Sequence, residues 1–111
     1  MSLTHSLKAS AEGEKHEWGT LYPNFAEVAE EEGFKEVATT FRNIAKVEAY
    51  HERRYLKLLE NLNSGTVFNK DKPIKWKCRN CGYVYEGSET REVCLVCNHP
   101  RSYFEVWTEN Y

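Results

Sequence analysis

Cys78-Arg79-Asn80-Cys81 and Cys94-Leu95-Val96-Cys97 are two CxxC motifs separated by twelve residues. Each motif can present two sulfurs to one ion, and the intervening loop can bring the two pairs together. Sites made of four thiolates select few metals, mainly zinc and iron. The sequence therefore predicts one tetrahedral metal site in the last third of the chain, with Cys78, Cys81, Cys94 and Cys97 as its ligands.

The composition indicates a small globular protein. The chain has 111 residues, of which 41% are apolar and 29% charged. Its formal net charge of −2 argues against nucleic acid as the main partner, because nucleic-acid-binding proteins normally have a basic surplus. No apolar run is long enough for a membrane span or a signal peptide, so we expect a cytoplasmic protein without a membrane partner. In a reducing cytosol, the paired CxxC motifs fit metal thiolates better than disulfides.

The chain is expected to divide after a helical region. Helical patterns precede residue 64, whereas Gly, Pro, Cys and aromatic residues follow in short extended stretches. We predict a helical hairpin at 1–64, a linker at 65–73 and a small β-rich metal-binding domain at 74–111. The last domain needs its metal, because domains below ~60 residues bury too little surface to be stable alone.

Two helical patterns, at roughly 4–32 and 35–62, have charged residues where apolar ones belong. The stripe of the second pattern alternates spacings of four and three, as in a helix packed in a bundle. It consists of Val37, Phe41, Ile44, Glu48, His51, Tyr55, Leu58 and Leu62. Glu14 and Glu17 interrupt the first pattern at the same depth. Pro23 is expected to kink that helix, and Gly33 to form the turn between the two.

Carboxylates in a bundle core need a compensating cation, because burying them uncompensated is costly. Di-iron carboxylate bundles use a Glu from each of two helices and a Glu-x-x-His from each of two others. Here Glu14 is the single Glu, and Glu48-Ala49-Tyr50-His51 is the Glu-x-x-His. One chain therefore supplies half of such a site.

Taken together, these motifs resemble the rubrerythrin family over nearly the whole chain. Residues similar to its second helix pair are Gly13–Trp18, Tyr22-Pro23, Glu31–Phe34 and Glu48–His51. Residues similar to its rubredoxin-like domain are Trp76–Tyr83 and Cys94–Pro100, including the short spacing between the CxxC motifs. Leu95 departs from the family, which usually has a proline after the third cysteine.

The resemblance implies an NADH peroxidase-type oxidoreductase. Electrons from a reductase would pass through a rubredoxin-type Fe(Cys)4 centre to a non-haem di-iron centre, which reduces hydrogen peroxide to water. By position, Glu14, Glu48 and His51 would be iron ligands, with Glu48 bridging the two irons. Glu17 would be the additional carboxylate that binds one iron in the oxidised state. Tyr22 matches a tyrosine next to the site, where a phenol can hydrogen-bond to a metal-bound carboxylate.

Since a complete centre needs twice these ligands, we expect a two-fold homodimer of hairpins that forms a ferritin-like four-helix bundle. Other interpretations stay open. The chain could be a fragment or a split subunit that needs the other helix pair from another polypeptide. It could be a ferroxidase, an iron-handling protein or an electron-transfer module. A zinc-ribbon interaction module would use the same cysteines, with zinc in place of iron and without redox chemistry.

Overall fold

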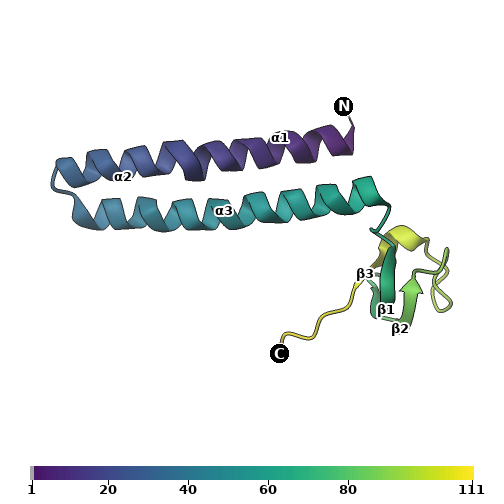
Figure 1. Ribbon diagram of the computed structural model, residues 1–111. Helices are drawn as coiled ribbons and strands as arrows, with labels where there is room; N and C mark the ends of the chain where they lie inside the picture. Colours follow the sequence, from purple (N-terminus) through teal and green to yellow (C-terminus); the bar gives the residue numbers. More distant parts are fainter. Residues whose placement is uncertain (1) are drawn as a thin grey trace. The chain divides into compact units, whose positions relative to one another are not determined.

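A computed structural model describes residues 2–111 and divides the chain into two compact units, one ending at Asn63 and the other spanning Ser64–Tyr111. The first unit is a long helical hairpin, and the second is a small antiparallel sheet with long loops (Figure 1). This architecture confirms the expected order of a helical hairpin and a small β-rich domain. The predicted domain boundaries stay a prediction, although the first strand begins at Asn69, within the segment expected to be the linker.

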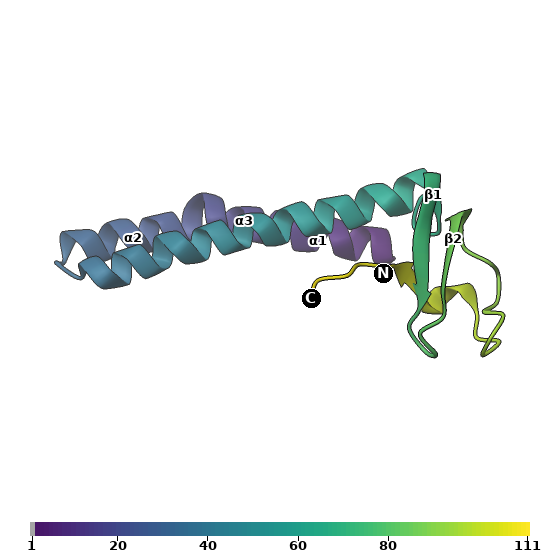
Figure 2. The ribbon, with the colours of Figure 1, turned by 90° about the horizontal axis from the view of Figure 1, so that it is seen from below.

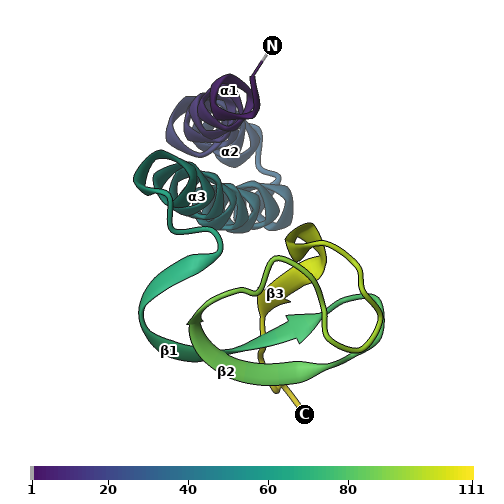
Figure 3. The same ribbon diagram turned by 90° about the vertical axis from the view of Figure 1, so that its right-hand side faces the viewer.

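The hairpin has two arms that lie side by side, as a view along it shows (Figure 3). The first arm consists of α1 (Leu3–His16), a π-helical segment (Glu17–Leu21) and α2 (Tyr22–Glu31). The second arm is one helix, α3 (Lys35–Ser64). Between the arms Gly33 has a φ of 85°, a left-handed conformation that glycine adopts without steric cost. Gly33 therefore forms the turn that the sequence predicts.

The π-helical segment interrupts the first arm shortly before Pro23. At its end, the N–H of Tyr22 donates to the carbonyl of Glu17, five residues earlier. A π turn accommodates one extra residue inside a helix and changes the rotation of the side chains on one flank relative to those on the other. Proline alone predicts one missing hydrogen bond. The irregularity instead extends back to Glu17, one of the predicted site residues.

The most deeply buried contacts between the two arms are made by alanines, with Phe41 packed against them. Ala11, Ala26, Ala29 and Ala38 are the buried apolar residues of this unit. Small side chains let the helices approach closely but fill little volume. Larger residues of the predicted stripe remain on the surface, with Val37 and Leu58 exposed by 45% and 41%. Within the described chain, an apolar face of the hairpin is therefore uncovered.

The second unit is a three-stranded antiparallel sheet of β1 (Asn69–Cys78), β2 (Val84–Glu89) and β3 (Phe104–Val106), in the order β2-β1-β3. Figure 2 shows β1 beside β2, which pair with Trp76 opposite Tyr85. The last residue of β1 is the first cysteine, so the sheet positions the metal site directly.

None of the helices in residues 2–111 has both the length and the apolar character needed to cross a membrane.

Candidate metal centres

The four cysteine sulfurs form a compact group, with all of them within 4.8 Å of one another. The sulfurs of Cys78 and Cys97 are 3.6 Å apart, and so are those of Cys81 and Cys94. A tetrahedron with metal–sulfur bonds of about 2.3 Å has edges of about 3.8 Å. The observed separations therefore fit one tetrahedral metal ion and exclude disulfide bonds within these two pairs.

Both CxxC motifs have the same backbone arrangement. The carbonyl of Cys78 accepts the N–H of Gly82, and the carbonyl of Cys94 accepts the N–H of Asn98, each at 2.9 Å. Gly82 and Asn98 have φ values of 85° and 62°, in the left-handed region that glycine and asparagine favour. The residue after each CxxC motif thus closes a tight turn that directs two sulfurs toward one point.

The protonation of the cysteines already differs without a metal. Hydrogen bonds from the backbone of His99 and the side chain of Asn80 lower the pKa of Cys97 to about 6. Although the backbone N–H of Tyr83 opposes the change, burial and the neighbouring thiols raise the pKa of Cys81 to about 12. The thiolate form is therefore favoured at Cys97, and a bound metal ion would displace the remaining protons.

Aromatic side chains pack around the buried half of this site. Cys78 and Cys94 are buried together with Trp76 and Phe104, and Tyr83 and Tyr85 pack against this cluster. The indole N–H of Trp76 donates to the carbonyl of Gly87 at 2.9 Å. Two of the four predicted metal ligands are thus part of the hydrophobic core of the second unit.

The second candidate site joins the two arms of the hairpin. Ligand atoms of Glu14, Glu48 and His51 lie within 4.8 Å of one another. His51 Nδ1 is 3.1 Å from Glu48 Oε2 and 3.5 Å from Glu14 Oε1. The side chains of Glu14 and Glu48 are only 17% and 15% exposed. The structure thus brings together the three residues that the sequence predicts as ligands from separate helices.

The charges at this site are poorly compensated by the protein. Glu14 Oε2 is buried and has no hydrogen-bond partner within the described chain. A hydrogen bond shared with Glu48 and then burial raise the pKa of Glu14 to about 7. The same hydrogen bond lowers the pKa of Glu48. A buried carboxylate pair that shares one proton and has an oxygen without a donor fits a bound cation.

The remaining predicted residues lie nearby but differ in their contacts. Glu17 lies near enough to raise the pKa of Glu14 and lower that of Glu48, yet it lies outside the compact group of ligand atoms. Tyr22 packs against Phe25 and Phe41, with ring centroids 6.1 Å and 6.0 Å away. A metal-ligand role for Glu17 and a hydrogen bond from Tyr22 to a metal-bound carboxylate stay predictions.

One polar contact beside the site was not predicted. The indole N–H of Trp18 donates to Glu52 Oε1 at 3.0 Å and joins the two arms. The sequence could have indicated this contact through its spacing. Trp18 follows Glu14, and Glu52 follows Glu48, by four positions, which is about one helical turn.

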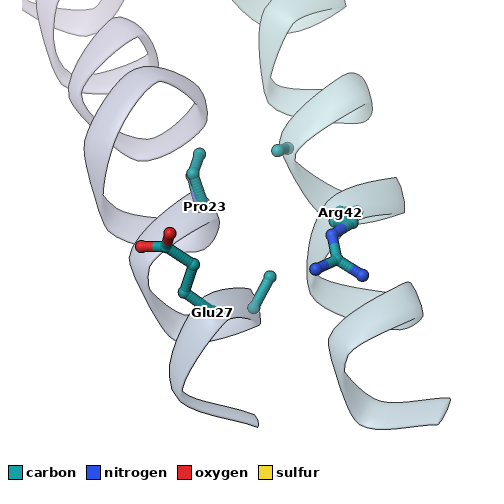
Figure 4. Close-up of a pocket in the computed structure, with 5 residues that line it drawn as sticks. Pro23, Glu27 and Arg42 are labelled. Atoms are coloured by element: carbon teal, nitrogen blue, oxygen red, sulfur yellow. The ribbon is translucent and has the colours of Figure 1, made fainter. Parts of the chain in front are cut away.

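Two hollows lie between α2 and α3, nearer the hairpin turn. One, of about 640 Å³, is almost entirely apolar and is lined by Phe25, Val28, Ala29, Glu32, Phe34, Val37 and Phe41. The other, of about 400 Å³, is lined by Pro23, Ala26, Glu27, Arg42 and Ala45. Figure 4 shows Glu27 and Arg42 on opposite sides of it, and Arg42 forms an ion pair with Glu30 at 3.1 Å.

Comparison with known families accounts for both units. The family model described as rubrerythrin matches residues 1–59, and the one described as rubrerythrin, rubredoxin-like domain matches residues 76–105. The chain belongs to the rubrerythrin family. The rubredoxin-like match contains all four cysteines, and together with their sulfur geometry it points to iron as the bound metal.

Curated relatives match this rubrerythrin-family chain over almost its full length. A rubrerythrin from Porphyromonas gingivalis is 54% identical over 110 residues, which are 99% of this chain and 55% of the relative. A rubrerythrin from Nitratidesulfovibrio vulgaris is 47% identical over 97% of this chain and 57% of the relative. The chain thus spans about half the length of these relatives.

Solved structures of nigerythrin have a similar fold. Nigerythrin in a partially reduced state matches with a TM-score of 0.55 and 29% identity, over 96% of this chain and 50% of that chain. Its fully reduced, all-ferrous state matches equally well.

Proposed function

We propose that this chain forms part of a rubrerythrin-type peroxidase, an oxidoreductase that reduces hydrogen peroxide to water. The observation that carries the proposal is the group of Glu14, Glu48 and His51, with a buried carboxylate oxygen that lacks a partner, in the same chain as a rubredoxin-like group of four cysteines. The first group suits a carboxylate-bound di-iron centre, and the second suits a one-electron Fe(Cys)4 relay.

Each residue has a proposed task. Glu48 would hold iron as a carboxylate, because its lowered pKa favours the ionised form. Glu14 and His51 would be terminal ligands, and Glu17 an additional carboxylate. Iron at this site would supply electrons to hydrogen peroxide, which takes up two electrons and two protons to give two molecules of water. The cysteine group would receive those electrons one at a time from a reductase.

A second hairpin is needed to complete the centre, and we propose a second copy of this chain. One hairpin provides one Glu and one Glu-x-x-His, half of a di-iron set. The uncovered apolar face supports this arrangement, since the hollow between Phe25 and Phe41 lies on the same hairpin as the half-site. A two-fold axis between the irons would cover both faces with identical surfaces.

The experiment is anaerobic reconstitution with ferrous iron, followed by metal analysis per chain and measurement of peroxide consumption. Glu48→Leu should lose the iron of the hairpin site and all peroxidase activity while keeping the Fe(Cys)4 absorption. Glu12→Leu, which changes an exposed glutamate of α1, is the matched control and should retain both. A Glu48→Leu variant with its full iron content would contradict the proposal, because leucine on a bundle stripe is stabilising if Glu48 is only structural. Rapid consumption of oxygen with ferrous iron, but not of peroxide, would indicate a ferroxidase instead.

A further inference from the structure

A hydrogen bond from Trp18 to Glu52 joins the two arms next to the candidate di-iron site, and the proposed function assigns it no role. Its donor and acceptor are 3.0 Å apart, both groups are partly buried, and the two residues are 34 positions apart in the sequence. A charged acceptor makes such a bond stronger than a neutral one.

Helix geometry places Trp18 and Glu52 on the sides of the two helices that face each other, next to the carboxylates of Glu14 and Glu48. Trp18 follows Glu14 by four residues, which places it about 40° around the helix. Ala11, which precedes Glu14 by three residues and is 3% exposed, lies on the same side. Glu52 has the equivalent position after Glu48. Long helical side chains point back toward the helix N-terminus, so in antiparallel arms both side chains reach the level of the metal ligands.

The bond also lies within the π turn. Trp18 is the second residue of the π-helical segment Glu17–Leu21. If this turn relaxed to an α-helix, one flank would rotate by about 100° relative to the other. Beyond the turn, Tyr22 stacks on Phe41 at 6.0 Å, which attaches the α2 flank to α3. Trp18–Glu52 attaches the start of the π-helical segment, next to α1, to the other arm. The two attachments would therefore oppose such a rotation.

We propose that Trp18 and Glu52 are positioning residues that fix the rotation of the first arm, so that Glu14 and Glu17 face Glu48 and His51. The alanine contacts alone cannot fix this rotation, because methyl groups are too small to resist turning of one helix against the other. This inference rests on the proposed metal binding at the hairpin, and it assigns to Trp18 and Glu52 no contact with metal or substrate.

The test uses the full chain with its cysteine site first filled with zinc, followed by titration with Co²⁺ and recording of its visible absorption. Trp18→Phe removes the N–H donor and keeps an aromatic ring, and Glu52→Leu removes the acceptor. Each should weaken Co²⁺ binding at the hairpin about tenfold and change the ligand-field spectrum, while circular dichroism shows unchanged helix content. The double variant should bind no more weakly than either single variant, because both remove the same bond.

Two controls separate positioning from general damage. Glu52→Gln keeps a carbonyl acceptor and should restore binding and spectrum to those of the unchanged chain. Trp107→Phe changes a tryptophan of the other unit, whose ring faces Lys75 Nζ at 5.1 Å, and should have no effect on Co²⁺ binding. Unaltered binding and spectra in Trp18→Phe and Glu52→Leu would overturn the inference, as would equal weakening in Glu52→Gln. Absence of Co²⁺ binding to the hairpin of the unchanged chain would instead overturn the proposed function, and the inference with it.

Discussion

Glu14 is a carboxylate that the hairpin buries without fully satisfying its hydrogen-bonding oxygens. Its carboxylate is 17% exposed, lies 3.5 Å from His51 Nδ1 and has one buried oxygen without a partner. The sequence could predict that Glu14 faces Glu48 and His51, because all three interrupt apolar stripes. It could not predict how protons are shared among them, because proton sharing depends on distances of a few ångströms that only the packed arms define.

The raised pKa of Glu14 predicts a pH dependence of stability in the metal-free chain. The carboxyl binds its proton more tightly when folded, with a pKa of about 7 against 4.5, so its contribution is complete below about pH 4.5 and is lost as pH rises through 7. Glu48 adds no slope in this window, because its lowered pKa affects stability only at lower pH. Urea unfolding followed by helical circular dichroism should show a smaller loss between pH 5 and 7.5 in Glu14→Gln. An identical loss in both proteins would contradict the assignment.

At the scale of the element, periodicity predicted the two helical arms but not which side chains pack between them. Spacings of four and three correctly placed two long helices and a turn at Gly33. The same stripe suggested that Val37 and Leu58 would pack inside, yet both are exposed, and the fully buried contacts between the arms are made by Ala11, Ala26 and Ala38. Phe41 of the stripe does pack against this alanine cluster. The reason is that a stripe identifies a face to be buried but not its partner. The π turn left no periodic signal beyond the nearby Pro23, because one inserted residue changes the phase only locally.

Two glycines of the hairpin should respond oppositely to alanine. A Cβ at Gly13 or Gly33 would meet nothing within 4 Å, but only Gly33 has a positive φ, of 85°. Gly13→Ala, inside α1, should stabilise the hairpin by about 0.5–1 kcal/mol through reduced freedom of the unfolded chain. Gly33→Ala should destabilise it by roughly 1 kcal/mol, because L-residues resist the left-handed region. Thermal unfolding of the two variants, monitored by helical circular dichroism, checks the signs, and equal shifts would contradict the reasoning.

At the scale of the molecule, the two units have separate cores, one of alanines in the hairpin and one around the cysteines. We therefore expect Cys81→Ser to abolish the iron–thiolate absorption and loosen the second unit while the helices remain formed. Visible absorption and proteolysis of residues 64–111 report on the sheet, and far-ultraviolet circular dichroism reports on the helices. Retained Fe(Cys)4-type absorption in Cys81→Ser would reject the assignment of the ligand.

Assembly should depend on the metal if a second copy completes the di-iron centre. Without metal, the carboxylates Glu14, Glu17 and Glu48 of two copies would face each other and repel, whereas iron would neutralise them. Light scattering during a ferrous titration should therefore show that dimers become tighter as the hairpin site fills. A monomer with a fully loaded di-iron centre would refute the arrangement, and so would a stable complex with a different polypeptide that carries the other two helices.

The small alanine side chains between the arms affect how fast the protein is degraded in a cell. Each buried methyl contributes only about 0.8 kcal/mol. With four buried alanines and larger apolar side chains that stay partly exposed, an isolated hairpin is close to the limit of stability. Newly made chains that have not found iron would open often and be cut by proteases, which act on the unfolded fraction. We therefore expect iron supply to set the turnover of the protein, with a longer half-life in iron-replete than in iron-starved cells.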